Sequence, residues 1–187
     1  AKITVLNWEE EPIQEIQGIV TGGTINIDGN SSVRRTCNIS VYVDNDEYTG
    51  LTSIDNLISL NKKIYLEVGF KNITKQYPQY DIIWFPQGLY VIITPSISHG
   101  TSGTSISLQL KDKMCLLNGE CGGVIPASTQ FDEYETTNEK GEYIIEKPVI
   151  AQIIREVVNH FGGEQLSKII VSDLDTRIKK VMKWIGN

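Results

Sequence analysis

The sequence has few of the residues on which most enzyme active sites depend. It contains two histidines, His99 and His160, and neither has an acid or a nucleophile at a recognisable motif spacing. Its three cysteines, Cys37, Cys115 and Cys121, lack the close pairing of a zinc ribbon or a redox motif. We therefore expect no catalytic residue, no metal site and no cofactor, and we expect the chain to fold in a reducing compartment.

Long hydrophobic runs are also missing. No apolar segment approaches the ~20 residues that a membrane-spanning helix needs, so we expect no membrane span. The first residues, AKITVLNWEEEP, do not combine a basic region with an apolar core, so we expect no secretory signal. Basic residues are not in excess, because 17 Lys and Arg stand against 23 Asp and Glu, a net charge of −6. That balance disfavours a generic nucleic-acid binder, which depends on contacts to phosphates.

The pattern that is present is a strict alternation of apolar and polar residues. It runs through residues 36–43, 63–70 and 103–110, and a period of two predicts strands with one buried face. Cys37 falls on an apolar face and is expected in the core. Weaker strands are predicted in residues 1–7 and 13–27, where glycines indicate a bulge or turn, and in 89–94, where Pro95 predicts a bend or a sheet edge. A glycine-rich loop at 99–103 predicts a hairpin.

The period changes after about residue 118. Residues 111–118 suggest a short helix opened by Asp112 and stopped by Gly119. Residues 120–147 carry seven acidic residues against two lysines, a net of −5, and predict an acidic loop with short strands at 124–125 and 143–145. A helix is expected from Pro148 to about residue 161, then a short strand at 169–171 and a second helix from Ser172.

These patterns predict an α+β protein: an antiparallel β-barrel or β-sandwich domain over residues 1–118, an acidic connector over 119–147 and a small helical module over 148–187. Two basic pairs are candidate interface residues. Arg34 and Arg35 precede the strand at 36–43, and Arg177 and Lys180 lie on the polar face of the expected second helix. Solvent exposure alone is the simpler interpretation of both pairs.

Acidic clusters elsewhere have an equally simple interpretation. Asp132, Glu133 and Glu135 could supply the two carboxylates of a glycosidase, but they lie in polar loop sequence and not on the rigid wall of a cleft. Asp44 and Asp46 lack the glycine and the distal glutamate of a calcium loop. Solvated loops and turns are therefore the favoured interpretation.

Four segments together resemble a known family. VRRTCNISVYVDN, NKKIYLEVGF, FPQGLYVIITPSIS and SISLQLKDKMCLLNG resemble the first tube-type β domain of phage tail hub proteins. PVIAQIIREVVNHFGG and the residues after it are similar to the helical insert that follows that domain. Hubs of this family are commonly longer and carry a second tube-type domain, so we expect the native chain to extend further.

The resemblance implies a structural role. It implies a virion protein, assembled in the host cytoplasm into a homo-oligomer (a trimer by family analogy), that joins the tail tube to spike or tip proteins. DNA would pass through the ring without specific binding. The polar face that would line this channel is neutral and includes Thr36, Asn38, Ser40, Ser105, Ser107 and Gln109.

Two other classes of function stay open. One is a tail-associated cell-wall hydrolase fragment, which would depend on residues such as Glu133 and Cys115. The other is a carbohydrate- or partner-binding β module, in which Tyr77, Tyr80 and Trp84 would form a binding platform.

Overall fold

The computed structural model describes residues 1–16, 18–44, 58–60, 62–73, 79–172, 176–177 and 182–183. The chain divides into two compact units, Ala1–Cys115 and Leu116–Asn187. The second unit includes both the segment 119–147 and the segment 148–187.

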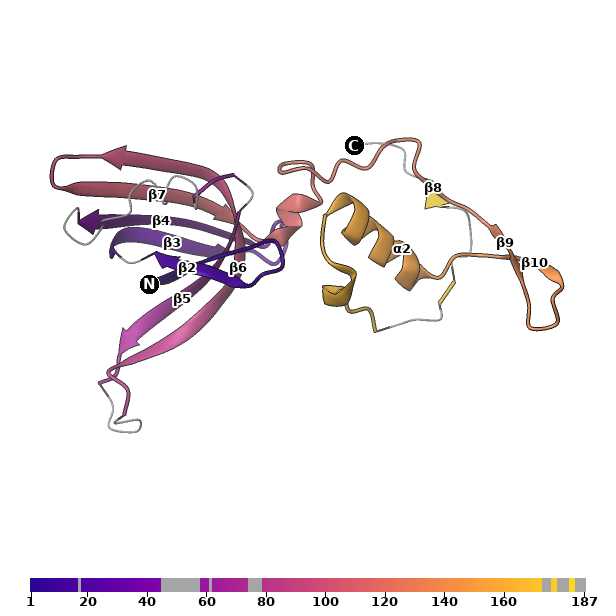
Figure 1. Cartoon of the computed structure of the whole chain (residues 1–187), viewed down its shortest axis with the longest axis horizontal. Coiled ribbons are helices and arrows are strands. Elements are labelled where there is room, and N and C mark those ends of the chain that lie inside the picture. The colour runs from indigo at the N-terminus through magenta and orange to yellow at the C-terminus, as the bar shows by residue number, and fades with distance from the viewer. Residues whose placement is uncertain are drawn as a thin grey trace. The chain divides into compact units, whose positions relative to one another are not determined.

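The first unit is built on one antiparallel sheet (Figure 1). Its seven strands follow the spatial order β2-β1-β5-β6-β7-β4-β3, so β2 and β3 form the two edges although they are consecutive in the chain. The strands are β1 (Lys2–Leu6), β2 (Pro12–Ile16), β3 (Ile19–Ile27), β4 (Arg35–Asp44), β5 (Lys63–Lys71), β6 (Ile82–His99) and β7 (Gly103–Lys111).

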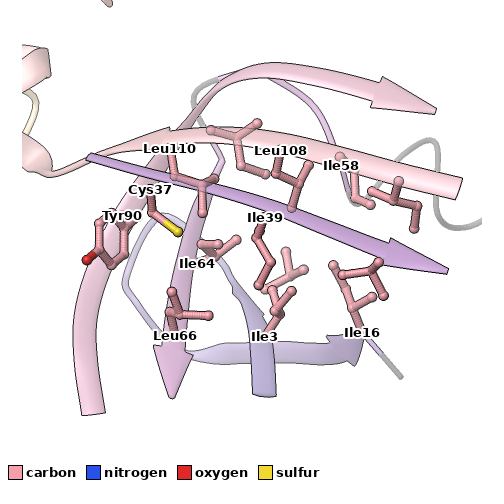
Figure 2. Packing of buried hydrophobic residues seen from close by; sticks show 14 of the residues in the cluster. Ile3, Ile16, Cys37, Ile39, Ile58, Ile64, Leu66, Tyr90, Leu108 and Leu110 are labelled. Atoms are coloured by element: carbon pink, nitrogen blue, oxygen red, sulfur yellow. The ribbon is translucent and has the colours of Figure 1, made fainter. Parts of the chain in front are cut away.

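The sheet curls around a single hydrophobic core (Figure 2). The alternating apolar residues predicted at 37–43 and 106–110 all point inward, where they meet inner residues of β1, β5 and β6. Cys37 is among them, as expected. Burial of this apolar surface drives folding, at about 25 cal/mol per Å² removed from water. The largest fully buried side chains are Tyr90, Ile3, Ile64, Leu66, Ile92, Ile106, Leu108 and Leu110.

Four register shifts interrupt the described sheet. They lie between Val20 and Gly22 in β3, between Ile92 and Thr94 in β6, opposite Leu66 and Glu67, where Gln87 is the additional residue of β6, and opposite Val5 and Leu6, where Ile13 is the additional residue of β2. A bulge increases local twist and curvature, which lets one sheet wrap around its own core. The register shift between Ile92 and Thr94 bears out the prediction of a bend near Pro95. The alternative of a sheet edge also holds locally, because in the described residues the part of β6 at Pro95 pairs with β7 alone.

The second unit is small and irregular. After the 3-10 helix η2 (Lys113–Leu116), β9 (Tyr134–Thr137) and β10 (Tyr143–Glu146) form a hairpin, and β8 (Gln130–Phe131) pairs with β11 (Met182–Lys183). The helix α2 (Ile150–Glu156) continues as a π-helical turn, η3 (Val157–Phe161), and a 3-10 turn, η4 (Leu166–Lys168), follows. The stop at Gly162 is confirmed, because the helical segment ends at Phe161. The helix expected over 111–118 was wrong in its bounds, because η2 covers only Lys113–Leu116 and ends before Gly119.

Several predictions for this unit were wrong. In the second helix expected from Ser172, the described residues are not helical: Arg177 forms a β-bridge with Val149, and Met182–Lys183 is a strand. Residues 124–125 and 169–171 are not strands, whereas β8 and β9 were missed within the segment expected to be a loop. In the segment from Ser172, apolar residues spaced three and four apart fit a helical pattern, but pairing with distant strands overrides that local preference.

The whole chain is therefore α+β and mainly antiparallel β, as predicted. In the residues that the structure describes, no helix is long and apolar enough to cross a membrane.

Candidate functional surface

The outer side of four neighbouring strands forms one continuous polar surface. Register pairs place Asn38 opposite Gln109 and Ser40 opposite Ser107, and the same rows extend to β3 on one side and to β6 on the other. We call this surface the hydroxyl face. Its members are Thr24 and Asn26 on β3, Thr36, Asn38 and Ser40 on β4, Ser105, Ser107 and Gln109 on β7, and Thr94, Ser96 and Ser98 on β6.

The hydroxyl face is accessible and uncharged. Asn38, Ser105, Ser107 and Gln109 are exposed, and Ser40 is half-buried, with its Oγ 3.5 Å from the Oγ of Ser107. Charged side chains on this side of β4 and β7 occur only at the ends, at Asp44 and Lys111. Such a surface exchanges hydrogen bonds with water but offers no cation to hold a phosphate.

All six residues predicted to line a channel lie on this face. The extension of this face onto β3 and β6 was not predicted from the sequence. The Ser-x-Ser spacing after Pro95 was the available signal for Ser96 and Ser98. It was missed because the bulge at residue 93 changes which side of the sheet the following alternate residues of β6 occupy.

The predicted basic pair before β4 divides into two roles. Arg34 is exposed. Arg35 closes the end of the sheet: its amide donates to the Asp112 carboxylate (2.8 Å), the Asp112 amide donates to its carbonyl (2.9 Å), and its guanidinium donates to the Gln87 carbonyl (3.0 Å). Arg35 therefore has a structural task inside the unit, and Arg34 is the member available to a partner.

The second predicted pair falls in the second unit. Arg177 donates to the Lys147 carbonyl and to the Glu146 carboxylate, the latter at 3.0 Å, and these bonds connect it to the β9–β10 hairpin. Hydrogen bonds from Arg177 to Tyr134 and Glu146 raise the pKa of the guanidinium. Lys180 lies outside the described residues.

The two sheet edges differ in their protection. β2 carries Pro12, and its Glu15 forms an ion pair with Lys2 at 3.6 Å. β3, IVTGGTINI, has neither a charged residue nor a proline, and it leaves Ile19 and Ile27 71% and 67% exposed. Proteins usually protect an exposed edge with charge, proline or a bulge, so β3, which has only a bulge, is the edge suited to pairing with another strand.

An ionic cluster that the sequence did not predict secures one end of the sheet. The Glu10 carboxylate accepts from Lys63 (3.0 Å) and Lys113 (2.7 Å), and the Lys63 ammonium lies 4.7 Å from the centroid of the Trp8 ring. Lys63 is 2% exposed. Glu10 has a left-handed backbone, with φ of 66°. The cluster joins the β1–β2 turn, β5 and η2 across more than 100 residues of sequence.

Two buried ionisable groups lie in the core and not at a surface. Burial raises the pKa of the Cys37 thiol to about 11, so this thiol is unreactive near neutral pH. Burial also raises the pKa of Tyr90, helped by Cys37 and Asp112 and opposed by Arg35. The Tyr90 hydroxyl is fully buried and has no hydrogen-bond partner in the structure.

The residues of the alternative functions have ordinary surroundings. Cys115 is completely buried in the first unit. In the second unit, Glu133 is partly exposed and lies 3.6 Å from the Lys147 ammonium. Trp84 and Tyr80 are exposed, whereas Tyr77 and the acidic residues at 46 and 47 lie outside the described residues. Over the described ranges, no group of three His, Cys, Asp or Glu side chains gathers to hold a metal ion.

Comparison with known proteins identified no relative. No family model, no curated protein and no solved structure matches this chain.

Proposed function

We propose that the chain is a structural subunit of a phage or phage-like tail hub. In this role copies of the chain form a ring, join the tail tube to the central spike or tip, and line the channel through which DNA passes. The observation that carries the proposal is the hydroxyl face: a broad, accessible and uncharged surface over four strands, on a sheet whose β3 edge is unprotected.

The two features support complementary parts of the role. An unprotected β3 edge favours pairing with a second copy, because the unpaired backbone N–H and C=O groups then gain partners. A neutral face favours rapid passage of DNA, because each Lys or Arg that contacts a phosphate adds affinity and slows release. The net charge of −6 also favours passage of DNA without binding, because it repels the phosphates.

The test is assembly of the purified chain. We expect light scattering at several concentrations to give a mass of three or more subunits, and electron microscopy to show closed rings. Ile19→Lys and Ile27→Lys, which add charge to the β3 edge, should weaken assembly. Ile13→Lys on β2, where the side chain is 47% exposed, is the matched control and should not.

A persistent monomer, or closed pairs with no rings, would contradict the proposed function. Equal effects of the β2 and β3 variants would contradict the role of the β3 edge.

A further inference from the structure

The far ends of β5 and β6 form a ribbon that the rest of the sheet does not flank. β1 pairs with β5 only over residues 63–67, and β7 pairs with β6 only from residue 91 onward. Residues 68–71 and 82–85 therefore pair only with each other in the described part of the chain (Figure 1). We call these two segments the ribbon. Two strands alone are at best marginally stable in water.

One side of the ribbon continues the apolar pattern of the core. The bulge at Gln87 keeps Val68, Phe70, Ile83 and Phe85 on the side of the sheet that carries Ile64 and Leu66. Phe70 and Phe85 meet edge to face, with centroids 5.6 Å apart, yet they are 60% and 47% exposed. A groove of about 430 Å³ lies along them, lined by Phe70, Lys71, Asn72, Ile73, Ile83, Phe85 and Gln87.

Among the described residues, one part of the core is left uncovered. Between β3 and β5 lies a largely apolar opening of about 380 Å³, within the range of roughly 300–1,000 Å³ in which proteins bind apolar groups. It exists partly because Gly23 faces the core opposite Ile39 without a side chain. The side chains that line it include Val20, Ile25, Ile39, Leu66 and Val68.

The ribbon and the opening complement each other. The ribbon has an apolar aromatic side, and in the described residues its two strands pair only with each other. The opening has apolar walls beside β3, an edge strand with no charged residue. We propose that the ribbon of one copy closes the opening of a second copy, with Phe70 and Phe85 against the walls of the opening. This contact rests on the proposed function, because it names the surfaces through which neighbouring copies meet.

The arrangement is head-to-tail: each copy presents a ribbon to one neighbour and an opening to the other. Such heterologous contacts produce rings when the rotation between copies closes. They also permit a complementation test: Val68 belongs to both surfaces, but Phe70 and Phe85 do not line the opening and Ile25 is not part of the ribbon, so each surface can be altered separately.

The experiment compares the wild-type chain with three variants by light scattering and analytical ultracentrifugation. In the ribbon variant, Phe70→Glu and Phe85→Glu are combined; in the opening variant, Ile25→Glu places a carboxylate among the apolar walls. Each should weaken self-association at least about 100-fold, the scale expected when buried aromatic or aliphatic anchors are lost from an interface. Trp84→Glu is the matched control, because Trp84 lies on the opposite side of the ribbon, over Gly69, and should not change assembly.

Mixing the ribbon variant with the opening variant should restore pairs, but not rings, because each mixed pair has one intact contact. Circular dichroism of each variant checks that it is folded. Folded variants that assemble like the wild type, or a mixture that stays monomeric, would overturn the contact. The contact between copies would also be overturned if the ribbon variant still self-associated and lost only its binding to lipid vesicles or to another tail protein.

The two proposals fail in different ways. Rings that persist in the ribbon variant support the hub and overturn this contact. Closed pairs that depend on Phe70 and Phe85, without any rings, support this contact and overturn the hub.

Discussion

The carboxylate of Glu10 lies 3.0 Å from the ammonium of Lys63, a side chain that is almost completely buried beside Trp8. Removal of one partner from a buried ion pair leaves the other charge uncompensated, which costs about 3 kcal/mol or more. We therefore expect Glu10→Gln to lower the free energy of unfolding by about that amount, measured by urea denaturation. Glu15→Gln is the control: Glu15 is exposed and its partner Lys2 is only partly buried, so the loss should be below about 1 kcal/mol. Similar losses in both variants would show that the cluster has no special role.

Alkaline pH should destabilise the first unit through Cys37. Its folded pKa is raised to about 11 from an ordinary value of 9.0, so between these values the unfolded chain releases the proton and the folded chain retains it. The free energy of unfolding should therefore fall as pH rises from 9 to 11, by a total of roughly 2 to 3 kcal/mol. Denaturation of Cys37→Ala across this range should show a shallower fall than the wild type. Identical slopes would contradict the prediction.

Thiol reactivity gives a second measurement of the same burial. Cys37 and Cys115 are buried, whereas Cys121 is partly accessible. At neutral pH we expect one thiol to react rapidly with a chromogenic disulfide reagent and the other two to react only on unfolding. Loss of the fast phase in Cys121→Ser would identify it, and a fast phase that survives in this variant would contradict the assignment.

The unpartnered Tyr90 hydroxyl predicts a stabilising substitution. A buried hydroxyl without a hydrogen bond costs about 1–3 kcal/mol, and Tyr90→Phe removes it while the ring stays in the core. We expect this variant to unfold at a higher urea concentration than the wild type. Tyr90→Leu, which also loses ring volume, should be destabilised instead. A clear loss of stability in Tyr90→Phe would show that the hydroxyl has a partner, such as an internal water.

The hydroxyl face should acquire affinity for DNA when positive charge is added. We expect the wild type to show no measurable binding to duplex DNA, and Ser40→Lys combined with Ser107→Lys to bind in a manner that weakens steeply with salt. Asn30→Lys combined with Thr101→Lys adds the same charge at exposed turns and is the control. Strong binding by the wild type would argue against a channel surface through which DNA slides.

The sequence predicted the parts of the fold that depend on local periodicity. The alternation through Cys37 to Val43 and Ile106 to Leu110 identified both the strands and their buried faces, since an antiparallel sheet with one solvated side imposes a period of two. The hydroxyl face followed from the same pattern on β4 and β7.

Features that depend on distant partners could not be predicted in this way. The Glu10 cluster unites residues from three separated segments, and no spacing within any one segment indicates it. The strand Met182–Lys183 forms because it meets Gln130–Phe131, and this pairing overrides a helical spacing. The exposure of Phe70 was hidden for a similar reason, since its alternation with Ile64, Leu66 and Val68 is that of a core residue.

The additional residue at Gln87 has a consequence for variation in this protein. Side chains in a strand alternate between the two sides, and the bulge absorbs the one residue by which β6 exceeds β5 between Gly88 and Pro86. A chain that lost Gln87 would therefore pair without a bulge and keep Phe85 opposite Val68 and Trp84 opposite Gly69, each on its present side of the sheet. Such a deletion would reduce the twist at the base of these two strands, because a bulge increases local twist, and would leave the aromatic surfaces where they are.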